Sequence, residues 1–427
     1  MQRLTCLALL TAFLLGPARA GAAATQQETV SKPDSLAAAQ QALEAKEYKR
    51  AVALLEEYLA QHPEHLGARF NLAYGYSLLG RAQEAIAAYR QALALDPKLF
   101  QAYLNAGLLL IQEGAPAEAA KLLAQAIQLR PEHVGARLAY ADALARSGDK
   151  QSARAEYEAV LSRDPDNPDA QLGLARFALE AGQWAQAEKH LRSVLKQDPN
   201  RLEARPLRAE SLFGLNRLAE AAQELEAYLA ARPDDAAIRE HAARIDRELG
   251  ENEAALRHYD HLLAAGTWTN ELEAARARTL AALDRWEEAA AVFERLVAAE
   301  PGNVEFRYDL GLIRLRLQAP EAAAQALREA VRLRPDFVDA LNSLALASEQ
   351  AGNCAEALRV LDARAAHAAE NAGTYFLRAI CHDRLHHLDA AIENYEKFLA
   401  AGAPADSPQV FQARARLRLL KRQRERR

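Results

Sequence analysis

The chain has 427 residues, of which 53 are Lys or Arg and 58 are Asp or Glu, so its formal net charge is −5 at pH 7. This acidic balance disfavours nucleic-acid binding, because a protein that neutralises phosphates presents a basic stripe.

Residues 1–20 are predicted to form a signal peptide. Arg3 supplies a positive start, Leu4 to Leu15 an apolar stretch, and Pro17 to Ala20 a small-residue exit, so we expect cleavage after Ala20. The stretch is shorter than the roughly twenty apolar residues of a spanning helix, and an uncleaved N-terminal anchor is the alternative. Residues 21–31 are small and polar and are expected to form a flexible lead-in. No later segment has a transmembrane pattern, so we expect an exported protein, periplasmic or secreted.

A helical hairpin is predicted within residues 66–99. Two amphipathic segments of about a dozen residues are separated at Leu79, Gly80 and Arg81 and are closed by Asp96 and Pro97. Small residues in both segments allow the two helix backbones to approach closely where they cross.

This hairpin recurs at a period of 34 residues. Eleven uninterrupted blocks fit residues 32–405; the eighth residue of each block is Ala or Gly, and the twentieth is always Ala. The closing prolines stand in register, at Pro63, Pro97, Pro131, Pro165, Pro199, Pro233, Pro301 and Pro335. Pro206 instead falls in the first turn of a first helix, where we expect an irregular start.

The period, the two small-residue columns and the closing proline resemble the tetratricopeptide repeat family. The resemblance covers residues 32–405 and implies an all-α fold, a right-handed solenoid of stacked helix-turn-helix repeats. The early tryptophan of the family pattern is missing, and the closing proline is replaced at Thr267, Ala369 and Ala403. We expect these changes to affect helix ends and not the fold.

Residues 406–427 are predicted to form a capping helix with a basic tail. Val410, Ala413, Leu417 and Leu420 recur at helical spacing and can cover the last hairpin. From position 407 to the end, eight Lys or Arg stand against Glu425 alone. This tail could bind an anionic surface or neighbour, or it could be a solvated cap.

We find no catalytic, cofactor or metal motif in the sequence. A glycine-rich phosphate loop, a G-x-S-x-G elbow and a Cys-x-x-Cys pair are all missing, so we expect no enzyme and no cofactor. His382 and His386 would share one helical face, but aspartate stands where a zincin has its glutamate, and no third ligand follows. His258 and His261, three residues apart, have even less support, so we predict no metal site.

A disulfide between Cys354 and Cys381 is possible. These are the two cysteines that remain after signal removal, and export to an oxidising compartment permits a bond. The alternative is a pair of small buried thiols.

A partner-binding groove is predicted on the face of each first helix opposite its second helix, which by resemblance lines the concave surface. Apolar residues on this face form two patches. The first contains Phe70, Tyr74, Leu104, Leu108, Ile111 and Leu138, and the second contains Tyr308, Leu312, Leu315, Leu346, Phe376 and Ile380. Between them lie Glu240, Arg244, Arg247 and Arg278. The alternative is that neighbouring first helices bury these apolar residues among themselves.

These observations favour a non-enzymatic scaffold or adaptor that holds a protein or peptide ligand in its groove. Envelope assembly, secretion or pilus-type machinery is the expected setting. A periplasmic scaffold for polysaccharide export is the alternative. The sequence does not define the oligomeric state or the identity of the partner.

Overall fold

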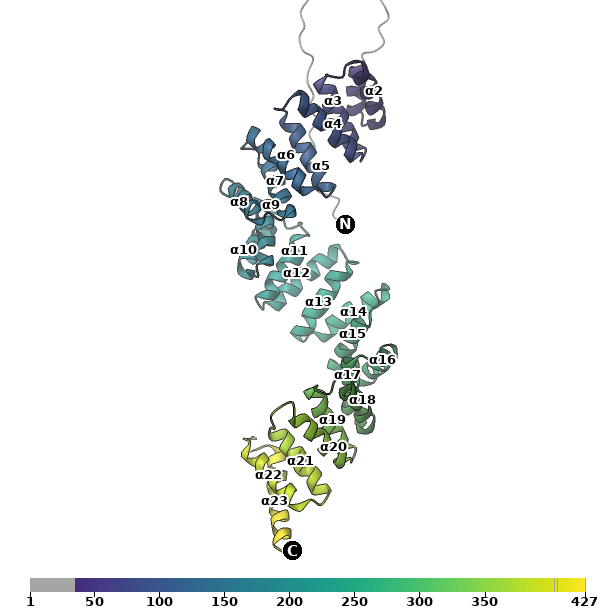
Figure 1. Cartoon of the computed structure of the whole chain (residues 1–427), viewed down its shortest axis with the longest axis vertical. Coiled ribbons are helices and arrows are strands. Elements are labelled where there is room, and N and C mark those ends of the chain that lie inside the picture. The colour runs from purple at the N-terminus through teal and green to yellow at the C-terminus, as the bar shows by residue number, and fades with distance from the viewer. Residues whose placement is uncertain (1–34, 403, 405, 427) are drawn as a thin grey trace, which may run out of the picture. The chain divides into compact units, whose positions relative to one another are not determined.

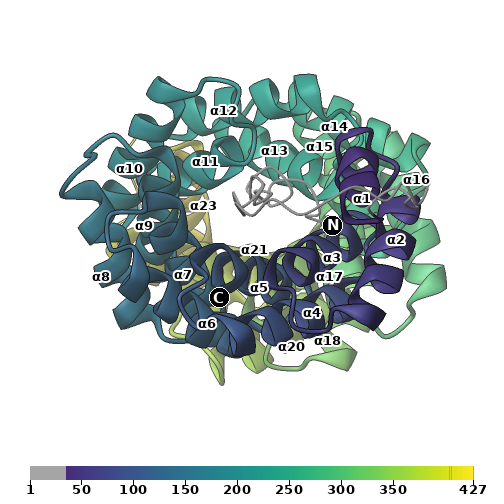
Figure 2. The same cartoon turned by 90° about the horizontal axis from the view of Figure 1, so that it is seen from above.

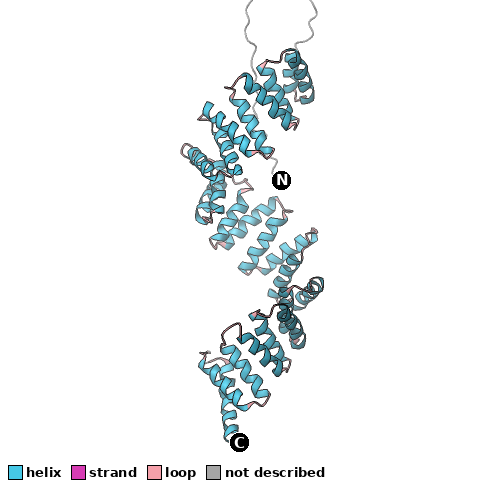
Figure 3. Cartoon of the chain, in the orientation of Figure 1, coloured by secondary structure: helices cyan, strands magenta, loops and turns pink. Residues whose placement is uncertain are grey.

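The computed structural model describes residues 35–402, 404 and 406–426, and within them the chain forms 23 helices joined by short loops and no strand (Figures 1 and 3). The predicted signal peptide, the lead-in and the first three residues of the first block lie outside the described residues. Across the described part, no helix combines the length and apolar character that crossing a membrane requires. The chain divides into two compact units, unit 1 (Met1–Glu224) and unit 2 (Leu225–Arg427).

Unit 1 is a series of helical hairpins in which an odd-numbered helix pairs with the even-numbered helix that follows it, from α1 with α2 to α9 with α10. Its helices are α1 (Ser35–Glu44), α2 (Tyr48–Gln61), α3 (Leu66–Leu78), α4 (Ala82–Leu95), α5 (Phe100–Gln112), α6 (Pro116–Leu129), α7 (Val134–Ser147), α8 (Lys150–Leu161), α9 (Pro168–Glu180), α10 (Trp184–Gln197) and α11 (Ala204–Gly214), and α12 (Leu218–Ala231) crosses into unit 2. As predicted from Pro206, α11 is irregular: it begins at the third residue of its block and has 11 residues.

Unit 2 continues the same pattern and ends with an unpaired helix. Its helices are α13 (Ala236–Leu249), α14 (Asn252–Ala264), α15 (Asn270–Ala282), α16 (Trp286–Ala299), α17 (Val304–Arg316), α18 (Pro320–Leu333), α19 (Val338–Gln350), α20 (Cys354–Ala365), α21 (Ala372–Arg384), α22 (Leu388–Ala400) and α23 (Pro408–Glu425). The last of these packs on α22 and buries Val410, Ala413 and Leu420, as a capping helix should.

Each hairpin turns at the same place in its block. The fifteenth residue has a positive φ in all eleven blocks; it is glycine in six of them, as at Gly80, and a non-glycine residue in five, as at His386. Glycine has no Cβ to clash in this left-handed conformation, whereas the other residues adopt it at some strain. The turn therefore depends on its position in the block more than on glycine.

The two small-residue columns mark where the helices of a hairpin cross. All eleven alanines of the twentieth column are fully buried, and so is every residue of the eighth column that has a side chain. At Gly107 the approach is so close that an added Cβ would lie 2.5 Å from Cγ of Leu123. Gly311 stands in the same relation to Leu327, again at 2.5 Å. These columns set the backbone separation, because close-packed interiors leave no room for an added methyl group.

A hydrogen bond that we did not predict recurs at the repeat boundaries. The fourth residue of the block donates to the carbonyl of the closing proline six positions earlier, as in Arg205 Nη2 to Pro199 O at 3.0 Å and Arg307 Nη2 to Pro301 O at 2.8 Å. The same bond joins Arg69 to Pro63, Arg137 to Pro131, Gln171 to Pro165 and Arg239 to Pro233. It satisfies a carbonyl just outside a helix start.

Candidate functional site

In each unit the first helices of the hairpins lie on the inner side and the second helices on the outer side (Figure 2). In unit 2, α13 and α15 lie inside α14 and α16, and neighbouring first helices touch from α15 through α17 and α19 to α21. We call the surface of the first helices turned away from their second helices the inner face. The residues of the predicted groove lie on the first helices, but Phe70 and Phe376 pack against the second helix of their own hairpin, on Tyr89 and Phe398, and so do not belong to the inner face.

In unit 1 most of the predicted groove residues are core. Phe70, Leu104, Leu108 and Ile111 are buried in one hydrophobic cluster, and only Tyr74 and Leu138 stay half-buried. The prediction that the first patch is an exposed surface is therefore wrong for these four residues. Neighbouring hairpins pack tightly enough to cover the face that a single hairpin would expose, as the alternative required.

In unit 2 the predicted patch remains partly accessible. Leu346 on α19 is 40% exposed, and the residues of the same column on the adjacent helices, Leu312 on α17 and Ile380 on α21, are half-buried. We call these three residues the apolar column. The other members of the patch are also half-buried: Tyr308 packs against Phe337, Leu315 against the same cluster as Tyr308, and Phe376 against Phe398.

The four charged residues between the predicted patches come together at one depression of about 420 Å³ on the inner face of unit 2. Five of its lining residues come from α13, two from α15 and one from α14: Ala237, Glu240, His241, Arg244, Arg247, Ala275, Arg278 and Tyr259. The charged members were predicted from sequence, whereas His241 and Tyr259 were missed. His241 stands next to Glu240 in the sixth column of its block, and Tyr259 comes from a second helix, which the groove prediction did not include.

The depression carries an excess of positive charge. Three guanidinium groups face one carboxylate, that of Glu240, and Arg278 also pairs with Asp309 on α17 at 2.7 Å. Burial raises the pKa of Tyr259, which is 2% exposed, above its ordinary value of 10.0, so this hydroxyl remains protonated and can donate. Arginine forks and a phenolic O–H together suit a carboxylate or another oxyanion.

A group of three potential metal ligands in unit 2 is better explained as a hydrogen-bonded cluster. His258 Nε2 lies 2.9 Å from Glu226 Oε1 and 3.4 Å from Asp246 Oδ2, while Arg239 Nη1 lies 3.2 Å from His258 Nδ1. An arginine N–H can only donate, so Nδ1 of His258 accepts the hydrogen bond from Arg239. The ring proton is therefore on Nε2, which donates hydrogen bonds to the two carboxylates. To bind a metal ion, His258 would have to offer the lone pair of Nε2. Its ring proton would then be on Nδ1 and would face the N–H donor of Arg239.

The other histidine pair does not form the predicted arrangement. Helix α21 ends at Arg384, and His386 occupies the left-handed turn position, so His382 and His386 do not share a helical face. His382 instead lies beside His387, with 3.3 Å between their Nδ1 atoms.

Cys354 and Cys381 are neighbouring buried thiols that share a small cluster with Ala357. Burial, and the adjacent Cys354, raise the pKa of the Cys381 thiol above its ordinary value. The possible disulfide stays a prediction, and its two partners lie side by side.

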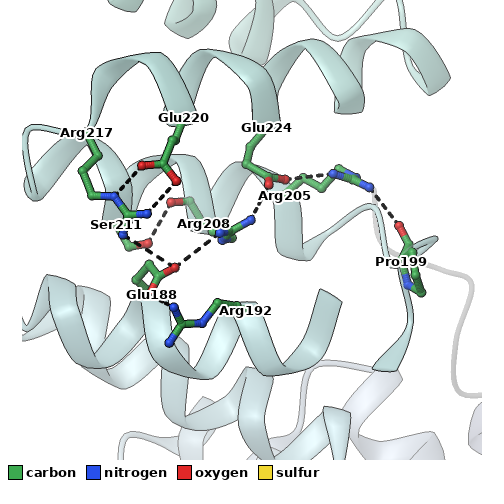
Figure 4. Close-up of polar contacts among 9 residues, drawn as sticks. All are labelled: Glu188, Arg192, Pro199, Arg205, Arg208, Ser211, Arg217, Glu220 and Glu224. Carbon is green, nitrogen blue, oxygen red and sulfur yellow. Dashed lines mark hydrogen bonds and ion pairs between the residues drawn. The ribbon is translucent and has the colours of Figure 1, made fainter. Parts of the chain in front are cut away.

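A half-buried ionic network joins α10, α11 and α12 (Figure 4). Arg208 on α11 bridges Glu224 on α12 at 2.5 Å and Glu188 on α10 at 3.3 Å, and Arg205 also reaches Glu224, at 2.9 Å. Arg217 joins the network at Glu188, 3.8 Å away, and also pairs with Glu220 at 2.6 Å. Every carboxylate here has a cationic partner, so the network fastens neighbouring hairpins and offers no unpaired acid or base for catalysis.

The fold is an α-solenoid of helical hairpins, the class of repeat proteins in which each unit contacts its neighbours. Models described as "Tetratricopeptide repeat" match residues 146–210 and residues 104–168, 274–336 and 320–373, and one described as "TPR repeat" matches residues 73–114. The chain belongs to the tetratricopeptide repeat family, which confirms the family and the fold class predicted from sequence. Such repeats are typically scaffolds without catalytic groups of their own. No curated protein matches the sequence.

Solved structures with a similar fold are distant in sequence. A tetratricopeptide repeat protein from Parabacteroides merdae is 17% identical, with 60% of this chain and 98% of that one covered and a TM-score of 0.43. PilW, described as a widely conserved type IV pilus biogenesis factor, is 23% identical over 47% of this chain and 93% of its own, with a TM-score of 0.41. Tom70 from yeast is 13% identical, with 92% and 96% covered and a TM-score of 0.35.

Proposed function

We propose that the chain is a non-catalytic scaffold that binds a segment of a protein partner along the inner face of unit 2, in the assembly or secretion machinery of a cell envelope. The apolar column carries this proposal. Leu346 is 40% exposed, whereas in the same column of unit 1 Leu108 is buried and Tyr74 is half-buried. Leu346 also lies between two half-buried residues of this column. Adjacent apolar side chains left accessible on a soluble surface usually mark an interface.

The basic depression gives this surface a preference for a partner segment with an acidic side chain. It lies on α13 and α15, and successive first helices lead from there to the apolar column on α17, α19 and α21. A partner segment with apolar side chains and, further along, an acidic side chain would match both features. Apolar burial supplies the larger share of affinity, while charge pairing fixes register and partner choice.

The export signal predicted for residues 1–20 supports the envelope setting. Cleavage after Ala20 and a periplasmic or secreted destination are part of the proposal. N-terminal sequencing of the protein recovered from the periplasm and from the medium tests both, and a chain that keeps Met1 in the cytoplasm would contradict them.

Site-specific photocrosslinking in intact cells tests the binding surface. Leu346 is replaced by a photoreactive phenylalanine analogue, and the control carries the same analogue in place of Leu95, which is also 40% exposed but lies on the second helix α4. We expect a discrete protein adduct, identified by mass spectrometry, from position 346 and not from position 95. Identical adducts from both positions, or no adduct from position 346, would refute the proposal.

The nature of the adduct also separates the two scaffold classes. A protein at position 346 supports the adaptor, whereas a glycan there would favour a scaffold for polysaccharide export. Once the partner is known, Leu346→Ser should lower its affinity by about tenfold or more without changing the melting temperature, because truncating an interface anchor typically costs about 2 kcal/mol. Arg247→Glu should weaken the same partner only if an acidic side chain enters the depression.

A further inference from the structure

The capping helix α23 has an inward face and an outward face of different character. Inward, Val410, Ala413 and Leu420 are buried in the cluster that covers the last hairpin. A capping helix needs no more than this, and its outward face would be expected to be polar. The outward face instead carries both apolar and basic side chains.

Apolar side chains recur along the outward face. Phe411 is 64% exposed and Leu419 is 54% exposed, and Ala415, also exposed, lies between them at a spacing of four residues on either side. Residues spaced by four lie on one side of a helix, so these three form a continuous stripe. Two large exposed apolar residues on one helix side are unusual for a solvated cap.

The basic residues of α23 also differ in their pairing: some form ion pairs with the last hairpin, and others flank the outward stripe. Arg416 pairs with Asp383 at 2.5 Å and Lys421 with Glu396 at 2.6 Å, and both carboxylates belong to the last hairpin. Arg414, Arg418 and Arg422 flank the apolar stripe, and within residues 406–426 and the other described residues none of them has a carboxylate at ion-pair distance. Three exposed arginines thus accompany the stripe with their charges uncompensated.

We propose that the outward face of α23 binds the surface of a membrane rich in anionic phospholipid. An interfacial helix lies in the plane of the membrane with Phe or Leu directed toward the acyl chains and Lys or Arg beside them at the headgroups, and the stripe with its flanking arginines matches this arrangement. Arginine suits this role because its aliphatic stem packs with apolar groups while its guanidinium bonds phosphate bidentately. A flat lipid surface also contacts the whole convex stripe at once, whereas a protein partner would need a matching groove.

The outward face of α23 shares no residue with the inner face, so lipid binding there is independent of the partner segment proposed for the inner face. A scaffold attached in this way would present its inner face beside the membrane, where envelope proteins are assembled. The apolar stripe is short, so binding should be reversible and should depend on both the arginines and the apolar residues.

Cosedimentation of the full mature chain with lipid vesicles tests the proposal. Vesicles contain phosphatidylglycerol mixed with phosphatidylcholine, or phosphatidylcholine alone, at low and at high salt. We expect binding to the anionic vesicles only, and loss of that binding at high salt, because salt screens exposed charges. Equal binding to both vesicle types, or no binding to either, would overturn the proposal.

Matched variants assign the binding to one face. Each arginine near an anionic surface contributes about fivefold to partitioning, so R414Q, R418Q and R422Q together should lower it by roughly a hundredfold. The control removes the same number of charges from paired positions, with R416Q, K421Q and R424Q, and should lower it far less. Vesicle binding that survives the first triple variant, or falls equally in both, would place the site elsewhere.

A second variant keeps the test valid if a triple variant folds poorly. Phe411→Ser with Leu419→Ser changes only exposed side chains, so the helix content and melting temperature should stay constant while vesicle binding falls by about tenfold or more. Light scattering after gel filtration is run in parallel. If the wild-type chain is a dimer that this double variant converts to a monomer, the face belongs to a second copy and the membrane proposal is wrong.

Discussion

Replacing Phe70 with alanine tests whether the predicted groove of unit 1 is core. The ring is 1% exposed and lies 5.4 Å from the ring of Tyr89, centroid to centroid. An aromatic side chain buries roughly 150–250 Å², and at about 25 cal/mol per Å² this corresponds to about 4–6 kcal/mol. Alanine keeps the Cβ, and Phe→Ala changes in cores typically cost about 3–5 kcal/mol, so we expect a loss in that range.

The loss should be local, since the stability of a solenoid is a sum over repeats and their interfaces. Amide hydrogen exchange, followed by mass spectrometry on peptides from each helix, is therefore the assay. Exchange in α3 and α4 should become roughly 10² to 10⁴ times faster if those helices exchange by local opening, while α8 and α9 change little. Melting of the whole chain would hide this difference.

Tyr74→Ala is the matched control, because Tyr74 is half-buried one turn further along the same helix. It should accelerate exchange much less than Phe70→Ala. If Phe70→Ala leaves exchange within about twofold of the wild type, the ring does not support the core and the burial argument fails.

Three further outcomes are expected. Gly107→Ala should lower the melting temperature, because its Cβ would meet a buried leucine at 2.5 Å, whereas Gly302→Ala, with nothing within 4 Å, should leave it unchanged; equal shifts would contradict the close crossing. Glu188→Ala should cost about 1–3 kcal/mol in urea unfolding because it removes a buried carboxylate and leaves Arg208 with Glu224 as its single ion-pair partner, and Glu188→Gln should cost less. Since burial raises the pKa of Cys381, its thiolate fraction at pH 8 is smaller in the folded chain, so iodoacetamide should label it slowly until the chain is denatured; fast labelling of the native protein would refute this.

The hairpins could be predicted from sequence because their determinants are local. The period of 34 residues, the small-residue columns and the closing proline all act within one block or between its two helices. The eighth and twentieth residues pack where predicted, with Ala73 and Ala85 fully buried. The left-handed turn follows the same register even where glycine is replaced, as at His386.

Burial of the inner face could not be predicted in the same way. Leu108 and Leu346 are both the ninth residue of their block, yet the first is 2% exposed and the second is 40% exposed. The difference depends on how closely successive hairpins pack, and that separation is set by many side chains in several blocks. The charged residues of α13 and α15 were predicted to share a face, but the depression they form with Tyr259 required the second helix as well.

The hydrogen bonds from the fourth residue to the closing proline have a consequence for how the chain folds. Each of them spans six residues, and helix packing joins hairpins that follow each other in the chain, so no long loop has to close before native structure forms. Such low contact order favours rapid folding. A hairpin fastened to its predecessor can serve as the template for the next one, so a chain emerging end-first from a membrane pore could build its structure repeat by repeat as it arrives.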